Sequence, residues 1–292
     1  MYGDHFYKEL GVVMLFVVGL STDVEISEKI QNESAVYHDI IQQSFIDSYR
    51  NLTWKLGVVM LFVVGLSTDV EISEKIQNES AVYHDIIQQS FIDSYRNLTW
   101  KALSWLSFVN DSCPHIEYVL KIDDDVIFDL FGVVDYLKNH SANANVSDDK
   151  RYIMCGVYSE WDKFPHRDNR SKWYVTKEEY AQDVYSPYCR GWQYMMPRST
   201  AINILDAAIG EKFYWIDDYF ITGHLGRKIN VTFDNIRQSH GSKKELVERK
   251  AVFWLASQNR LAEGKQIWDR IRTNYETQKN LNSNENQIQQ MS

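Results

Sequence analysis

The sequence predicts an α/β fold, a sheet with helices on both faces. Two observations support this class. Short apolar runs rich in Val and Ile alternate with longer segments of helical periodicity, as strand–helix units do. The 292 residues are 44% hydrophobic and contain no proline-rich or glycine-serine tract, so the chain can form a packed core. The net charge of −9 argues against nucleic acid as a partner, because phosphate backbones attract clustered Lys and Arg.

The first third of the chain contains an identical internal repeat. Leu10–Lys55 recurs letter for letter as Leu56–Lys101. Copies in a repeat architecture diverge because each has its own environment, so two identical copies indicate a duplicated exon or a gene-model error rather than a solenoid. Removing one 46-residue copy from the 292 residues leaves 246, which favours a single domain. We expect the second copy to form the native strand and helix. The first copy then either replaces a missing strand–helix unit or packs at an edge.

The first predicted elements lie within this repeat. The apolar runs Leu10–Leu20 and Leu56–Leu66 are shorter than the roughly 20 residues of a membrane span, and their Val-rich sequence predicts buried strands. From Glu79 to Val109, apolar residues recur every three to five positions, which predicts a single helix.

Strand–helix alternation continues through the rest of the chain. We expect strands at 117–122, 151–157, 192–196 and 230–233, and helices at 128–139, 198–209 and 217–225. The aromatic and irregular segment 159–190 is typical of a long functional loop. The charged segment 243–275 carries an apolar stripe that predicts one long helix, and the polar residues 279–292 are expected to be disordered.

Three consecutive aspartates, Asp123, Asp124 and Asp125, follow the strand expected at 117–122. Neighbouring like charges raise carboxylate pKa values, and a hard divalent cation such as Mg²⁺ or Mn²⁺ relieves the repulsion. Residues i and i+2 of an extended segment point the same way, so Asp123 and Asp125 can face one site. In open α/β sheets such sites lie beyond the carboxyl ends of the strands. The alternative is a solvated acidic turn without a ligand.

The residues around these aspartates resemble a known family. The segment 121–126, KIDDDV, is similar to the K-x-DDD-V core of the β-1,3-galactosyltransferases and β-1,3-N-acetylglucosaminyltransferases, glycosyltransferase family 31, which also includes fringe-type enzymes. Four further segments resemble family motifs in the family's order: 91–99 (FIDSYRNLT), 172–180 (KWYV followed by EY), 185–194 (YSPYCRGWQY) and 215–223 (WIDDYFITG).

Several positions depart from the family pattern. Asp217 stands where the family usually has Glu, Gln193 where it has Gly, and Tyr219 where it has Val. The family's first strand, its R-x-x-x-R-x-T-W segment and its membrane anchor have no counterpart before Leu10, so we expect an N-terminally truncated product. We divide the chain into a surplus first copy at 10–55, a GT-A-like glycosyltransferase domain at 56–242, a C-terminal helix packed on it at 243–278, and the disordered tail at 279–292.

The resemblance implies a GT-A fold, with a mixed and mostly parallel sheet flanked by helices, and an inverting, metal-dependent hexosyltransferase. Such an enzyme moves galactose or N-acetylglucosamine from a UDP-sugar to the 3-hydroxyl of a glycan acceptor on a glycoprotein or glycolipid. The family's E-D-V position implies Asp218 as the general base, with Asp217 beside it. The implied donor-binding residues are Asp123, Asp124, Lys172 and Gly191. The implied ligands of Mn²⁺ or Mg²⁺ are Asp123, Asp125 and His240, although a loop histidine such as His240 can also be merely solvated.

Other interpretations stay open. The missing N-terminal segment fits a non-catalytic or truncated family member with impaired donor binding, which binds carbohydrate only. A hydrolase that uses Asp125 and Asp218 as its carboxylate pair is a further alternative, although it leaves the later motifs unexplained. Six aromatic residues of the loop region are expected either to line an acceptor cleft or to pack in the core: Trp161, Trp173, Tyr174, Tyr185, Tyr188 and Trp192.

Frequent Asn-x-Ser/Thr sequons favour an origin in the secretory pathway, although the N-terminus lacks the layout of a signal peptide. Together with the resemblance, this predicts the lumenal side of the Golgi apparatus and a type II membrane protein as the full-length parent. The three cysteines permit one disulfide, for which Cys113–Cys189 is a candidate and Cys155 an equal competitor. The sequons begin at Asn32, Asn51, Asn78, Asn97, Asn110, Asn139, Asn145, Asn169 and Asn230.

Overall fold

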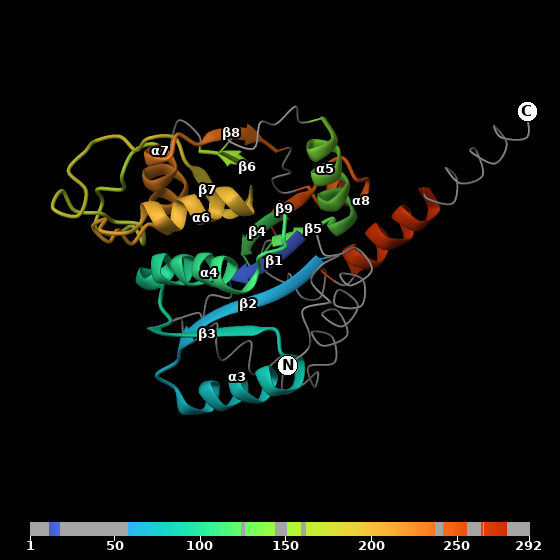
Figure 1. Ribbon diagram of the computed structural model, residues 1–292, viewed down its shortest axis with the longest axis horizontal. Coiled ribbons are helices and arrows are strands. Elements are labelled where there is room, and N and C mark those ends of the chain that lie inside the picture. Colours follow the sequence, from blue (N-terminus) through green and yellow to red (C-terminus); the bar gives the residue numbers. More distant parts are fainter. Residues whose placement is uncertain are drawn as a thin grey trace, which may run out of the picture. The chain divides into compact units, whose positions relative to one another are not determined.

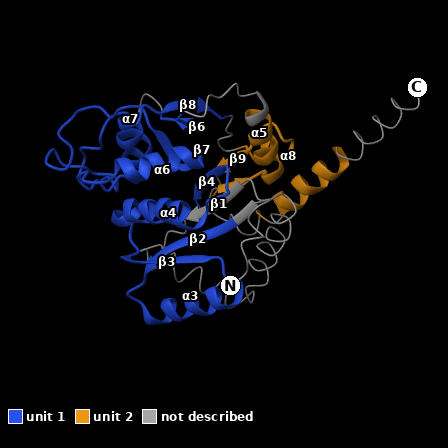
Figure 2. Cartoon of the chain, viewed as in Figure 1, with its two compact units in different colours: residues 1–32, 50–124, 147–236 blue, residues 33–49, 125–146, 237–292 orange. Residues whose placement is uncertain are grey.

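The computed structural model (Figure 1) describes the chain in segments. These are residues 12–17, 58–123, 126–143, 151–158, 162–236, 242–255, 264 and 266–278. The chain divides into two compact units, coloured separately in Figure 2. Unit 1 comprises residues 1–32, 50–124 and 147–236, and unit 2 comprises residues 33–49, 125–146 and 237–292. None of the helices in these described segments is both long and apolar enough to cross a bilayer.

Unit 1 is built on a mixed seven-stranded sheet with the order β3-β2-β1-β4-β7-β6-β8. Its strands are β1 (Val12–Val17), β2 (Val58–Leu66), β3 (Ile86–Ile92), β4 (Tyr118–Asp123), β6 (Tyr152–Val157), β7 (Cys189–Pro197) and β8 (Thr232–Asn235). The pairs β3–β2, β2–β1, β1–β4 and β6–β8 are parallel, whereas β7 runs antiparallel to both β4 and β6. The mixed, mostly parallel α/β sheet that the sequence predicted is therefore confirmed.

The strand of the first repeat copy, β1, lies inside the sheet. Val12 pairs with Val58 of β2 on one side and with Tyr118 of β4 on the other, both in parallel register. Of the two placements considered for the first copy, the strand thus follows the one within the main sheet rather than at an edge. Residues 18–55 of that copy lie outside the described residues.

The single helix predicted from Glu79 to Val109 is wrong. This region contains the end of α3 (Val70–Tyr83), the strand β3, the short 3₁₀ turn η2 (Tyr95–Asn97) and α4 (Leu98–Ser112). The α3 helix ends because His84 adopts a left-handed conformation with φ of 56°, while its N–H donates to the Ser80 carbonyl. As an edge strand, β3 carries exposed polar residues between its apolar ones, so its spacing imitates helical periodicity.

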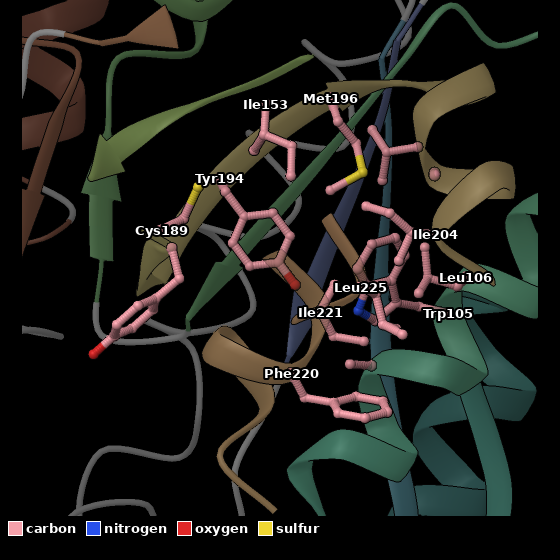
Figure 3. Packing of buried hydrophobic residues seen from close by; sticks show 14 of the residues in the cluster. Trp105, Leu106, Ile153, Cys189, Tyr194, Met196, Ile204, Phe220, Ile221 and Leu225 are labelled. Atoms are coloured by element: carbon pink, nitrogen blue, oxygen red, sulfur yellow. The ribbon is translucent and has the colours of Figure 1, made fainter. Parts of the chain in front are cut away.

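One face of the sheet is covered by α4, α6 (Arg198–Ala207) and the π-helical segment η3 (Tyr219–Leu225). Figure 3 shows Trp105 and Leu106 of α4 in the same buried cluster as Tyr194 of β7 and Phe220 of η3. Burial of these large apolar side chains is the main stabilising term of the unit. The helices predicted at 198–209 and 217–225 and the strands predicted at 117–122, 151–157 and 192–196 are confirmed within a few residues.

The disulfide joins Cys155 of β6 to Cys189 of β7, with a Cα–Cα distance of 5.7 Å. Cys113 is buried and free, so the Cys113–Cys189 pairing is wrong and its competitor is observed. The two bonded cysteines belong to adjacent antiparallel strands, whereas Cys113 follows the last residue of α4. The disulfide anchors the beginning of β7, two residues before Gly191.

Unit 2 contains β5 (Val126–Phe128), α5 (Leu130–Asn143), α8 (Lys243–Val247), β9 (Phe253–Leu255) and a helix at 266–278. The single long helix predicted over 243–275, and with it the C-terminal helical domain at 243–278, is wrong. Arg249 follows α8 with a φ of 57°, and the chain then forms β9, which pairs antiparallel with β5. Trp268 belongs to the apolar stripe of the predicted helix and packs as an apolar residue: its ring stacks on that of Phe131, with the ring centroids 5.7 Å apart. Residues 279–292 lie outside the described part.

Candidate active site

Lys121 and Asp123 lie on the same side of β4, near the carboxyl end of the strand. The ammonium group of Lys121 donates to the Asp123 carboxylate and to the Gly191 carbonyl of β7. The Lys121 side chain is only 4% exposed, while that of Asp123 is 36% exposed. Burial lowers the pKa of Lys121, but the charges of Asp123 and Asp217 outweigh it, so the net pKa is raised and the lysine stays charged.

Asp217 and Asp218 immediately precede η3 and lie close enough to β4 to interact with Lys121. Asp218 caps η3, because its Oδ1 accepts the N–H of Tyr219 at 2.8 Å. The Thr222 hydroxyl donates to the Asp218 carbonyl at 2.6 Å and accepts the Cys189 N–H at 2.9 Å. These hydrogen bonds connect the disulfide-anchored strand β7 to the aspartate that we predicted as the base.

Gly191 lets Asp218 approach β7 closely. A Cβ atom at position 191 would lie 3.0 Å from both the Cβ and the Oδ2 of Asp218, which is tighter than ordinary van der Waals contact. The lack of a side chain at Gly191 therefore allows this close packing, and its carbonyl also accepts a hydrogen bond from Lys121. Its predicted role in donor binding stays a prediction.

The electrostatics of the aspartate pair suit proton transfer. Burial, together with the neighbouring charge of Asp217, raises the pKa of Asp218 to about 7. Burial likewise raises the pKa of Asp217, against the lowering effect of Lys121. A carboxylate with a pKa near neutrality can accept a proton and release it again, which is what a general base requires. Three carboxylates facing one lysine also leave an excess of negative charge, which fits a hard divalent cation.

Aromatic side chains face this carboxylate group. The Tyr95 hydroxyl accepts a hydrogen bond from the Trp173 indole N–H at 2.6 Å, and the Lys172 ammonium lies 4.5 Å from the Trp173 ring centroid. Burial raises the pKa of Tyr95 to about 12, while the Trp173 hydrogen bond lowers it and the charges of Asp217 and Asp218 raise it. Lys172 is thus placed on an exposed aromatic wall near the aspartates. Its donor-binding role stays a prediction.

Two other predicted acceptor residues instead support η3 from within the core. Tyr185 and Tyr188 are 5% and 7% exposed, and their rings pack against Tyr219, at 4.3 Å between the centroids for Tyr185. The hydroxyls of Tyr180 and Tyr219 lie 2.9 Å apart, as part of a hydrogen-bonded tyrosine cluster. Tyr219, the residue that replaces the family's Val, is therefore the centre of this cluster. For Tyr185 and Tyr188 the alternative of core packing is the observed one.

The remaining predicted ligands cannot be placed. Asp124, Asp125 and His240 lie outside the described residues, as does Trp161. Within the described ranges, no group of three or more His, Cys, Asp or Glu side chains is arranged to hold a metal ion. The metal ligand set therefore stays a prediction, of which the structure describes Asp123.

The arrangement of motifs agrees with the comparison of this chain with known families. A sequence model described as "Galactosyltransferase" matches residues 4–61 and 54–237. The chain belongs to the galactosyltransferase family. The two matched stretches overlap at residues 54–61, around Leu56, where the second repeat copy begins, so each copy is matched to the family separately.

Curated members of the galactosyltransferase family align over most of this chain. Beta-1,3-galactosyltransferase 1 of Mus musculus and of Homo sapiens are each 29% identical over 235 residues, which is 80% of this chain and 56% of the relative. Beta-1,3-galactosyltransferase 2 of Homo sapiens is 31% identical over 212 residues, or 72% of this chain and 38% of the relative. The chain thus spans about half the length of these relatives. A solved glycosyltransferase involved in glycosylation of the major capsid of PBCV-1 aligns with 88% of this chain and 98% of its own, at 8% identity and a TM-score of 0.38.

We expect the Gly191→Ala variant to impair catalysis, because the added methyl group displaces the Asp218 carboxylate by a few tenths of an ångström. A displacement of this kind lowers kcat by roughly tenfold to a hundredfold, since proton transfer depends on geometry. Gly226→Ala is the matched control, because a Cβ there meets its nearest neighbour at an ordinary 3.6 Å. Steady-state kinetics of both variants test this expectation, and equal kcat values for the two would contradict it.

Proposed function

We propose that the chain is an inverting hexosyltransferase that moves galactose or N-acetylglucosamine from a UDP-sugar to the 3-hydroxyl of a glycan acceptor. One observation carries the proposal: Asp218, with a pKa near 7, is held beside Asp217 and the Lys121–Asp123 pair at the end of β4. Family membership supports a nucleotide-sugar donor and a glycan acceptor, and the relatives' names support the β-1,3 linkage. An acceptor on a glycoprotein or a glycolipid fits equally.

The reaction follows from the proposed positions of these groups. The acceptor hydroxyl attacks the anomeric carbon of the donor while Asp218 takes the hydroxyl proton. The bond between the anomeric carbon and the diphosphate oxygen breaks, and its electron pair leaves with UDP. Attack opposite the leaving group inverts the configuration at that carbon. Lys121 keeps the Asp123 carboxylate and the Gly191 carbonyl in position, and β7 in turn holds Asp218 through Cys189 and Thr222.

The excess of carboxylates fits a bound Mn²⁺ or Mg²⁺. We assign Asp123 and Asp125 as its ligands and His240 as a third, with Asp124 nearby. A cation held there would neutralise charge on the departing diphosphate. Gly191 and Lys172 remain the other proposed contacts of the donor.

We place the enzyme on the lumenal side of the Golgi apparatus, as a type II membrane protein in its full-length form. The described sequon asparagines at 78, 110, 139, 169 and 230 are exposed and can carry glycans. Asn97 differs, because its side-chain amide donates to the Ile92 carbonyl at 2.7 Å and its sequon residue Thr99 is fully buried. The observed disulfide fits the same oxidising compartment.

UDP binding distinguishes this proposal from the non-catalytic alternative. We expect Mn²⁺ to strengthen UDP affinity by about tenfold or more in isothermal titration calorimetry, because a cation held by Asp123 would offset the negative charge of the diphosphate. The Asp123→Asn variant loses this metal dependence, while the control variant Asp206→Asn, at an exposed position on α6, keeps it. Equal and weak UDP affinity with and without Mn²⁺ would favour a family member that binds carbohydrate only.

A further inference from the structure

A pocket in unit 1 lies beside the aromatic residues that face the carboxylates. Its volume is about 490 Å³, within the roughly 300–1,000 Å³ of small-molecule sites. Trp215, which lines it, precedes Asp217 by two residues, and the Tyr95 ring meets the Trp215 ring edge-on at 6.2 Å. We call it the Arg96 pocket. Its walls include Arg96, Thr176, Glu179, Lys212, Phe213 and Trp215.

The polar groups of the Arg96 pocket are held in fixed geometry. The Arg96 guanidinium lies 3.9 Å from the Trp215 ring centroid and donates to Glu179 Oε1 at 2.9 Å. The other carboxylate oxygen of Glu179 accepts the Thr176 N–H at 2.8 Å. Arg96 and Glu179 remain 54% and 33% exposed, so both can still bind a ligand. Trp215 is itself only 5% exposed, so its ring supports the Arg96 guanidinium, while the polar groups that a ligand can reach are those of Arg96 and Glu179.

An aromatic pair extends this pocket to the surface. The rings of Phe213 and Trp100 are stacked, with centroids 5.2 Å apart, yet these residues are 39% and 47% exposed. An exposed apolar patch rimmed by polar residues is typical of a ligand-binding groove. Sugar rings present apolar C–H faces that stack on such aromatic side chains, while their hydroxyls bond to charged groups at the rim.

The charged residues that line the pocket indicate whether its ligand is a neutral sugar or the anionic donor. Two cations, Arg96 and Lys212, are offset by two anions, Glu178 and Glu179. A site for a nucleotide diphosphate needs a surplus of positive charge, which these residues do not provide. The balanced set favours a neutral ligand with several hydroxyl groups.

We propose that the Arg96 pocket binds the second sugar unit of the acceptor, so that the natural acceptor is an oligosaccharide of at least two units. This inference rests on the proposed glycosyl transfer, because it assumes that the first acceptor sugar occupies the space next to Asp218. The second unit then stacks on Phe213 and bonds to Arg96 and Glu179.

Matched pairs of acceptors test this subsite. Methyl β-galactoside and methyl β-N-acetylglucosaminide supply single units, and lactose and N,N′-diacetylchitobiose supply the same non-reducing sugars with a second unit attached. We expect Phe213→Ala to raise KM by about fivefold to tenfold for the two-unit acceptors and to leave KM for the one-unit acceptors unchanged. Phe164→Ala, at an aromatic residue outside the pocket that is 50% exposed, is the control and changes neither. An equal change for both acceptor lengths, or none, would overturn the subsite.

Direct binding separates this inference from the proposed reaction. If the wild-type chain transfers sugar to none of the four acceptors, the proposed function fails, but the subsite is still tested by tryptophan fluorescence titration with lactose and N,N′-diacetylchitobiose. Binding by wild type and by Phe164→Ala that is weakened about fivefold or more in Phe213→Ala supports the pocket as a saccharide site. Absence of binding by the wild-type chain, or equal binding by all three proteins, overturns it.

Discussion

Replacement of Asp218 by Asn is expected to lower kcat for sugar transfer by roughly 10²–10⁴-fold, the range attributed to general acid–base catalysis. The asparagine side chain can still accept the Tyr219 N–H that caps η3, so the fold around it is retained. It cannot take a proton from the acceptor hydroxyl. The affinity of the variant for UDP is expected to stay within about threefold of the wild-type value, since the substitution is local. Asp206→Asn, at an exposed site on α6, is the control for loss of one carboxylate.

The pH dependence of the same reaction provides a second test of Asp218. Because its pKa is raised to about 7, the base is largely protonated below neutrality, and kcat/KM is expected to rise with pH through that value. A cation bound near Asp123 moves this inflection to lower pH. The same raised pKa means that ionisation of Asp218 costs folding free energy as pH increases from about 4 to 7. Asp218→Asn should therefore not lower the free energy of unfolding at pH 8. A variant that is inactive because it is unfolded would contradict the assignment.

Replacement of Lys101 by Met is expected to lower the free energy of unfolding by about 3–5 kcal/mol, the cost of breaking a buried ion pair from one side. Lys101 of α4 contacts Asp93, just after β3, at 2.8 Å, and their side chains are 0% and 1% exposed. Asp93 also accepts the Gly65 N–H at 2.9 Å. Without the lysine, the buried Asp93 carboxylate loses its ion-pair partner and lies against an apolar side chain.

Urea unfolding followed by circular dichroism measures this loss. The control is Lys75→Met on α3, whose ion pair with Glu71 is exposed at 60% and 73% and contributes little. The double variant Asp93→Asn/Lys101→Met removes both charges and is expected to recover part of the stability. A Lys101→Met protein as stable as the Lys75→Met control would contradict the account of this pair.

The strands of the sheet interior were predictable because their sequences are continuously apolar. The β4 and β6 strands are buried along almost their whole length, which is the pattern that apolar runs indicate. The β3 strand was not predictable in this way, since an edge strand with exposed Gln88, Gln89 and Ser90 lacks a continuous apolar run. The segment 243–275 was misassigned because its apolar stripe continues across β9, which is specified by pairing with β5 rather than by local sequence.

The sequence motifs named Asp123, Asp217 and Asp218, and the structure brings these three carboxylates close together. Their roles in the reaction stay predictions. The role of Lys121 as the buried partner of Asp123 was missed, although its i, i+2 spacing on a strand was a usable signal. The Arg96 pocket was not predictable, since it joins segments that are far apart in sequence. The choice of Cys155 as the partner of Cys189 likewise depends on the antiparallel pairing of β6 and β7.

The most direct test of the central claim is the structure of the reaction product. The wild-type chain is incubated with Mn²⁺, UDP-galactose or UDP-N-acetylglucosamine, and lactose or N,N′-diacetylchitobiose, and the product is examined by NMR. An inverting transferase that acts on the 3-hydroxyl gives a β1→3-linked trisaccharide from the α-linked donor, and the Asp218→Asn variant gives almost none. A product with retained α configuration, free sugar released without a nucleotide donor, or UDP binding without any turnover would contradict the account.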